Sequence, residues 1–245
     1  MNKYSTKNGI DALNLNRLAY RDYLAARFLL LNDYLIQGAT LSSSAIEKYL
    51  KIVLSIVGAT EPVHLDRIKK LEKAFEKHKI TILGELDPLY LNHLGKAYSL
   101  RYYDRIQGKK ILSVHKWQSL AELDASVHRI ESSINISRKD GSKFPTEYDN
   151  DCKSKSNHLL EQNHVLLKIS KKEFMEREGL CAIISINRNS RELQSRFVGV
   201  SPVEYAGKFL QVDDFVIEDK KLTISYNQPA KLSEEAKKKP GIVRD

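Results

Sequence analysis

The chain has 245 residues, of which 42% are hydrophobic and 29% are charged, and its formal net charge is +9 at pH 7. This balance is typical of a globular protein and excludes a disordered or collagen-like chain. The positive charge is compatible with a nucleic-acid or nucleotide ligand but does not select one.

The first 137 residues predict an antiparallel bundle of helices. A broad apolar stripe predicts a first helix over residues 11–37, which Gly38 would end. The segment LSSSAIEKYLKIVLSIV has apolar residues three and four apart and predicts a second helix over residues 41–57. The same spacing predicts a third helix over residues 64–79, with its lysines outward.

Two more helices complete the predicted bundle. Asp87 as a cap and Pro88 in the first turn predict a fourth helix that runs to about Arg105. Residues 108–110 then read as a loop. Leucine, valine and isoleucine at helical spacing predict a fifth helix over residues 117–136.

Beyond the bundle the composition changes. Residues 138–157 are polar and rich in turn formers, which predicts an interdomain linker. Residues 158–231 then predict a smaller β-rich domain, so the fold class is α+β. Its expected elements are strands over 164–169, 180–186, 196–200 and 209–212, a hairpin over 215–226 and a short helix over 171–177. Residues 232–245 predict a flexible tail.

The sequence predicts a cytoplasmic protein without metal or cofactor. Cys152 and Cys181 stand apart from any CxxC pair, which favours reduced thiols. The N-terminus lacks the apolar region of a signal peptide, and no apolar stretch is long enough to span a membrane. The seven histidines form no HxxxH or HExxH pattern, and no nucleotide-binding glycine motif occurs.

Two motifs carry a family resemblance, AIEKYLK at residues 45–51 and RYYD at residues 101–104. With them, residues 10–137 resemble the HEPN superfamily of helical bundles. The resemblance implies one of two functions. Catalytic members resemble metal-independent ribonucleases that use an R-x(4–6)-H motif at a dimer interface, and the others are binding or dimerisation modules.

The catalytic motif is missing, because no arginine of this chain is followed by a histidine at the required distance. We therefore expect a non-catalytic module that forms a homodimer and binds RNA or nucleotide. The resemblance implies a bacterial defence or toxin–antitoxin setting. Two alternatives stay open. One is a divergent ribonuclease that uses Arg101 and Arg105 with a histidine brought near by folding or by a second subunit. The other is a structural module that binds another protein.

The candidate ligand-binding residues are Arg101, Tyr102, Arg105, Lys48 and Lys51. Two arginines one turn apart beside a tyrosine can hold a phosphate and stack a base. In the alternative interpretation, Tyr102 or Tyr103 packs in the core, Arg101 pairs with Glu47 or Asp104, and the lysines are solvated helix charges.

Overall fold

The computed structural model describes the backbone of residues 6–59, 61–105, 109–136, 140–187, 192–200, 211–212, 215–218 and 221–224, and the side chains of most of these up to residue 186. Its helices are α1 (Thr6–Leu31), α2 (Leu35–Ile56), α3 (Ile68–Lys77), α4 (Pro88–Ser99), α5 (Lys116–Ser133), α6 (Glu147–Ser154), α7 (Asn157–Leu160) and α8 (Lys171–Met175). Short 3-10 helices are η1 (Leu65–Arg67), η2 (Ile82–Glu85) and η3 (Leu100–Arg105).

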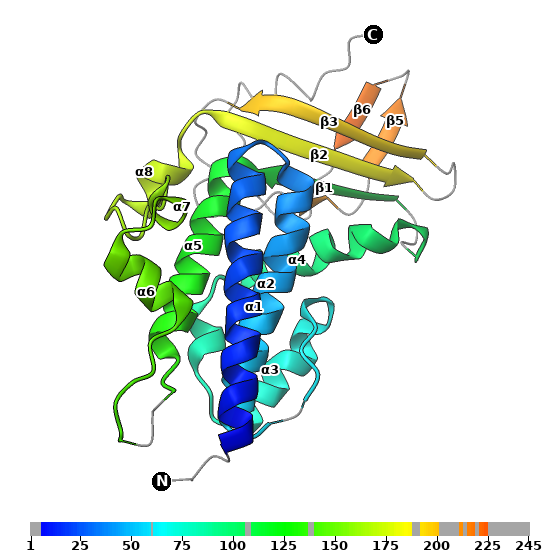
Figure 1. Ribbon diagram of the computed structural model, residues 1–245. Coiled ribbons are helices and arrows are strands. Elements are labelled where there is room, and N and C mark those ends of the chain that lie inside the picture. Colours follow the sequence, from blue (N-terminus) through cyan, green and yellow to red (C-terminus); the bar gives the residue numbers. More distant parts are fainter. Residues whose placement is uncertain are drawn as a thin grey trace.

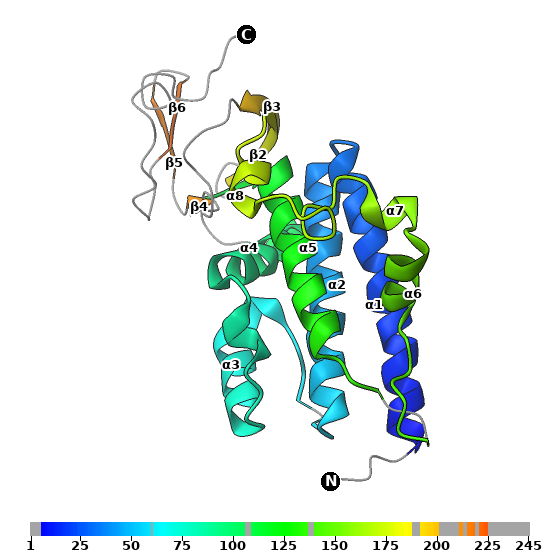
Figure 2. The same cartoon turned by 90° about the vertical axis from the view of Figure 1, so that its left-hand side faces the viewer.

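The strands are β1 (Lys109–His115), β2 (Gly179–Asn187), β3 (Glu192–Val200), β4 (Gln211–Val212), β5 (Phe215–Glu218) and β6 (Lys221–Ile224). They form an antiparallel sheet in the order β3-β2-β1-β4 and a separate β5–β6 hairpin. The mostly helical chain with antiparallel strands confirms the predicted α+β class in its broad form. The sheet lies across the end of the bundle where α1 turns into α2 (Figures 1 and 2).

The α1–α2 pair packs closely because of a glycine that the sequence analysis placed wrongly. Gly38 does not end the first helix, which stops at Leu31, but lies buried inside α2. A Cβ at Gly38 would lie 2.7 Å from the side chain of Leu30, so only glycine permits this approach. The turn between the helices instead uses Asp33, which has a positive φ of 66°.

The predicted start of α4 is confirmed. Asp87 caps the helix, its side chain accepting hydrogen bonds from the N–H groups of Leu89 and Tyr90, and Pro88 occupies the first turn. Further along α4, a Cβ at Gly95 would lie 2.6 Å from the carbonyl oxygen of Leu65. The glycine therefore lets η1 rest directly on α4.

Strand β1 corrects the loop expected over residues 108–110. The strand begins at Lys109 and pairs with β2 along its whole length, for example Leu112 with Ile184. It escaped prediction because it is short and runs straight into α5. The central sheet thus combines a strand from the expected bundle with strands from the expected second domain. The division into two domains stays a prediction.

Two further expectations after residue 137 are corrected. The polar segment 138–157 contains α6, whose Tyr148 is buried, because Thr146 and Asp149 form a capping box that starts a helix. Residues 164–169 form turns instead of a strand, with the N–H of Ile169 donating to the carbonyl of His164. Strand 180–186 and the hairpin are confirmed, and the tail over 232–245 lies outside the described residues.

A buried ion pair joins α1 to α5. The guanidinium of Arg27 binds the carboxylate of Asp124, and both side chains are almost fully shielded from solvent. Tyr23 donates to Asp124 at 2.8 Å, and Asn163 donates to Tyr23 at 3.2 Å. Burial alone would lower the pKa of Arg27, but Asp124 and Tyr23 raise it, so the arginine stays charged.

A second contact attaches β2 to the bundle. The indole nitrogen of Trp117, on α5, donates to the carbonyl of Glu178 at 2.6 Å. A Cβ at Gly179 would lie 2.7 Å from that nitrogen. The strand therefore enters the sheet directly against the Nε1–Cδ1 side of the indole. Among the described helices, none combines the length and apolar character that a bilayer crossing requires.

We expect Gly95→Ala to lower the free energy of unfolding by about 1–3 kcal/mol, because the methyl group would collide with backbone of η1. The matched control is Gly84→Ala, where a Cβ meets no atom within 4 Å. Urea unfolding followed by the fluorescence of Trp117, the single tryptophan, measures both variants. Equal stability of the two variants would contradict the packing described for η1.

Asp124→Ala should cost about 3–5 kcal/mol, because it leaves the buried charge of Arg27 without its partner. Asp22→Ala provides the comparison, since Asp22 pairs with Lys48 at a more exposed position. We expect that change to cost about 1 kcal/mol or less. Thermal unfolding by circular dichroism tests the contrast, which similar losses in the two variants would refute.

Acid should destabilise the protein through His93, which is fully buried on α4. Burial lowers its pKa from 6.5 to about 3. The unfolded chain therefore takes up a proton that the folded chain refuses, so stability is complete above pH 6.5 and is lost as the pH falls toward 3. His93→Asn should flatten the pH dependence of the unfolding free energy between pH 6.5 and 4, by up to about 1.4 kcal/mol per pH unit. The exposed His158→Asn control should leave that slope unchanged.

Candidate functional site

An aromatic and cationic cluster lies where α4 passes into η3. The guanidinium carbon of Arg101 lies 5.1 Å from the ring centroid of Tyr98, and the rings of Tyr98 and Tyr102 are 6.1 Å apart. Tyr102 has non-helical backbone angles, φ −121° and ψ 49°, so the chain kinks there. Its side chain is 41% exposed, and Arg101 is exposed as well. We call Tyr98, Arg101 and Tyr102 the aromatic–arginine cluster.

The cluster offers a positive charge to a ligand. Among the described residues, Arg101 forms no ion pair, and its partner is the face of Tyr98. A hydrogen bond with Tyr102 raises the pKa of Tyr98, so the hydroxyl of Tyr98 stays protonated at neutral pH. Tyr102 therefore does not pack in the core, and Glu47 accepts from the N–H of Leu65 and forms no ion pair with Arg101. The side chains of Tyr103 and Asp104, the other partners considered, lie outside the described residues. The side chain of Arg105 lies outside the described residues.

Glu47 has a structural role. Its carboxylate accepts a hydrogen bond from the N–H of Leu65 at 2.8 Å and so holds the start of η1. Burial raises the pKa of Glu47, against the lowering effect of that hydrogen bond and of nearby His64. Glu47 also acts electrostatically on Tyr98. The contact therefore places the exposed His64, next to Leu65 in the chain, near Glu47.

The two predicted lysines of α2 have different roles. Lys48 forms an ion pair with Asp22 of α1 and is partly buried, so it joins two helices. Lys51 is exposed and forms no ion pair with the described residues. It lies one helical turn beyond Glu47 on the same face of α2. Of the predicted residues, the structure thus leaves Arg101, Tyr102 and Lys51 accessible.

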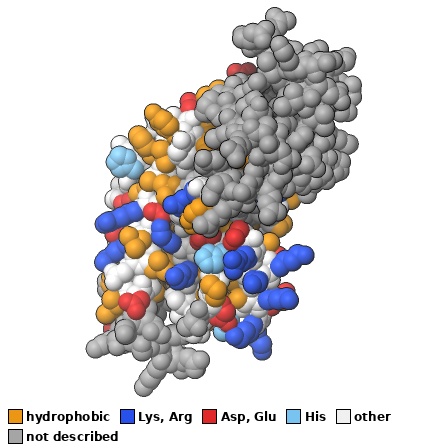
Figure 3. Space-filling view, turned by 90° about the vertical axis from the view of Figure 1, so that its right-hand side faces the viewer, with side chains coloured by type: hydrophobic (Ala, Val, Ile, Leu, Met, Phe, Trp, Pro, Cys, Tyr) orange, Lys and Arg blue, Asp and Glu red, His pale blue; other side chains and the backbone are white. Residues whose placement is uncertain are grey.

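Exposed lysines of α3 add positive charge on a neighbouring surface. Lys69, Lys70 and Lys73 point to solvent, whereas Lys77 pairs with Glu61 at 2.6 Å. Figure 3 shows Lys and Arg side chains spread over the lower part of one face, with acidic and hydrophobic side chains among them. The mixed signs support a solvated helix face more than a continuous nucleic-acid stripe.

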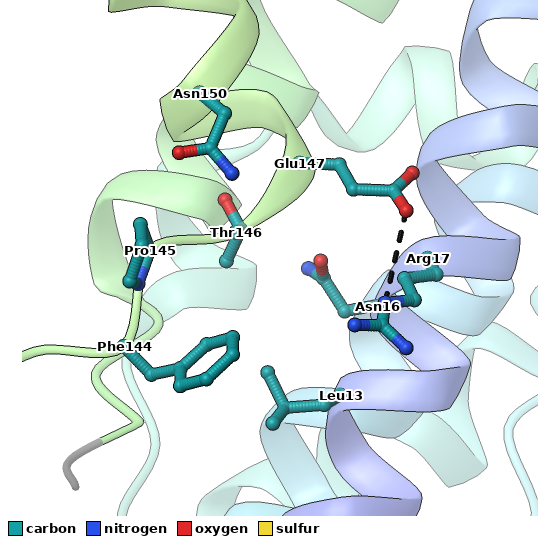
Figure 4. A pocket seen from close by; sticks show the side chains of 8 residues that line it. All are labelled: Leu13, Asn16, Arg17, Phe144, Pro145, Thr146, Glu147 and Asn150. Carbon is teal, nitrogen blue, oxygen red and sulfur yellow. Dashed lines mark ion pairs between the residues drawn. The ribbon is translucent and has the colours of Figure 1, made fainter.

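A small cavity of about 130 Å³ lies between α1 and the segment that starts α6. Asn16 faces it from α1, while Phe144 and Thr146 close the opposite side, and Arg17 and Glu147 form an ion pair at its edge (Figure 4). The amide of Asn16 donates to Glu131 at 3.0 Å, and Thr146 donates to the same carboxylate at 3.0 Å. These polar groups already form hydrogen bonds within the protein, so the cavity is a weaker candidate for a ligand site than the cluster.

The described residues provide no metal site, since no three of their histidine, cysteine or acidic side chains converge. His115 and Cys181 do meet, with Nε2 and Sγ 3.5 Å apart across β1 and β2. Burial raises the pKa of the Cys181 thiol to about 12, which makes it a poor nucleophile. The pair therefore belongs to the core of the sheet.

The sequence analysis found two members of the cluster and missed Tyr98. Tyr98 stands three residues before Arg101, which is the helical spacing for contact, so the signal was present. Glu47 and His64 lie far from the RYYD motif in sequence, and only the fold brings Glu47 within electrostatic reach of Tyr98 and His64 near Glu47. No family model, curated protein or solved structure matches the chain.

Proposed function

We propose that this protein is a HEPN-like, non-catalytic module that forms a homodimer and binds RNA or nucleotide through the aromatic–arginine cluster. The setting proposed from the resemblance is a bacterial defence or toxin–antitoxin system. The observation that carries the binding part is the exposed guanidinium of Arg101, held 5.1 Å above Tyr98 without an ion pair among the described residues.

The cluster has the chemistry that a nucleotide requires. The guanidinium can donate two parallel hydrogen bonds to a phosphate, and the face of Tyr98 limits the motion of that side chain. The half-exposed ring of Tyr102 offers a stacking surface to a base. Lys51, on α2, provides a second positive charge in addition to that of Arg101. The cluster contains no histidine or carboxylate that could act as general acid or base, so we expect it to bind without cleaving.

One observation favours a second candidate function, a divergent metal-independent ribonuclease. The bond from Leu65 to Glu47 holds the adjacent, exposed His64 near Glu47, which in turn acts electrostatically on Tyr98 of the cluster. A histidine there could act as a general acid or base on a phosphate bound by Arg101. His64 is therefore the distant histidine that this alternative requires.

Arg101→Ala should weaken binding of fluorescein-labelled single-stranded RNA about tenfold, because it removes a charge-assisted phosphate contact. It should also reduce the slope of log affinity against log salt by about 0.7. Tyr102→Ala should cost about 1–3 kcal/mol of binding free energy through lost stacking. Fluorescence anisotropy at several salt concentrations measures all three effects.

The matched control is Arg129→Ala, an exposed arginine on α5 that pairs with Glu85. It should leave the affinity unchanged. Cleavage of the RNA without metal, abolished by both Arg101→Ala and His64→Ala, would replace the binding proposal with the ribonuclease. Absence of binding to RNA and to ATP at low salt would instead favour the structural module that binds another protein.

A further inference from the structure

The outer face of α1 carries large apolar side chains that the fold leaves in solvent. Phe28 is 64% exposed and Leu18 is 53% exposed, although both belong to the apolar stripe expected to face the core. The core side of α1 is formed instead by residues such as Tyr20 and Tyr23. In Figure 1, α1 stands at the front of the bundle, with its outer face uncovered.

The exposed positions follow the spacing of a coiled-coil seam. They alternate by four and three residues along the helix, as the seam of two packed helices requires. In order they are Asn14, Leu18, Arg21, Ala25, Phe28 and Asn32. Asn32 lies just beyond the end of α1, and its side chain donates to the carbonyl of Phe28 at 2.8 Å.

This seam is complementary to itself when a second α1 runs antiparallel to it. The two-fold arrangement places Leu18 opposite Phe28 of the second copy, so the two large apolar residues cover each other. It also places the long side chain of Arg21 opposite the small Ala25. Asn14 and Asn32 then meet at both ends, where an amide pair can exchange hydrogen bonds.

The charges beside the seam are complementary as well. Arg17 and Arg21 lie near Glu147 of α6, at 3.7 and 4.0 Å, and their side chains remain 52% and 72% exposed. Glu161, at the end of α7, lies beside the other half of α1, where its carbonyl accepts from Arg27. The carboxylate of Glu161 is exposed and forms no ion pair with the described residues.

A two-fold axis perpendicular to α1 keeps the α6–α7 side of both copies on one side of the seam. Arg17 and Arg21 of one copy then lie level with residues 25–29 of the other, which is where Glu161 lies. The basic group of each copy therefore faces the acidic group of its partner, and the two-fold axis makes this contact occur twice in the dimer. This complementarity selects a second copy of the chain over an unrelated apolar partner.

We infer that two copies of this protein pair antiparallel along the outer faces of α1, with Leu18 against Phe28 on both sides of the central Arg21–Ala25 pairs and with Arg21 near Glu161 at the rim. The inference rests on the dimerisation part of the proposed function and names the surface. A typical stable interface buries about 800 Å² on each partner, which is more than one helix seam provides. The α6–α7 contacts are therefore part of the proposed interface.

The test is the mass of the full-length protein by light scattering at tens of micromolar. We expect twice the 28.1 kDa of one chain. Phe28→Glu and Leu18→Glu should each give a monomer with unchanged helical circular dichroism, because both positions are exposed in the single chain. Val57→Glu, an exposed apolar position at the end of α2, is the control and should stay dimeric.

Cross-linking checks the register. A mixture of the Arg21→Cys chain and the Ala25→Cys chain should form a disulfide-linked dimer on mild oxidation, and a mixture of Asn14→Cys with Ala25→Cys should not. In addition, Arg21→Glu should weaken the dimer, and Glu161→Arg in the same chain should restore it.

The outcomes separate the surface from the rest of the proposed function. A monomeric parent protein would overturn both the dimer and this surface. A dimer that survives Phe28→Glu and Leu18→Glu would overturn the surface alone. RNA binding is measured separately from the mass. The effect of Arg101→Ala on RNA affinity therefore tests the cluster, whereas the mass of Phe28→Glu tests the dimer surface.

Discussion

The ion pair between Arg27 and Asp124 is the constraint on which the rest of the structure depends. A guanidinium and a carboxylate can be buried together only if their remaining hydrogen-bonding groups are also satisfied. Here Tyr23, Asn163 and the carbonyl of Glu161 supply most of those partners. The pair therefore fixes α5 against α1 and also holds the turn-rich segment after α7. Once α1 is held in this rotation, its opposite face must point to solvent.

Helix starts and buried strands could be predicted from the sequence, because their signals are local. Asp87 and Pro88 mark the start of α4, and the apolar run over 180–186 marks β2. Gly38 was misread because a glycine that permits close helix packing has the same local signature as one that ends a helix. Residues 164–169 have the composition of a strand, but Asn163 and the Arg27 network impose turns on them. β1 depends on β2, more than sixty residues away, for its pairing.

The candidate site was predictable in part. Arg101 and Tyr102 were found because a short motif concentrates them, and the structure keeps both accessible. The ion pair of Lys48 could not be predicted, because its partner Asp22 lies on another helix and gives no sequence signal. The structural function of Glu47 was hidden for the same reason, since its hydrogen bond reaches Leu65 across the fold. Contacts between distant elements decide which charges remain free for a ligand.

The contact of Trp117 with Gly179 has a consequence for how this architecture can change over time. Any side chain at 179 would displace the indole, so the entry of β2 into the sheet is restricted to glycine for as long as a tryptophan stands at 117. Beyond β2, the edge strand β3 pairs on one side only among the described strands. Divergence of the sheet should therefore accumulate from β3 onward, while the residues at this junction change together or not at all.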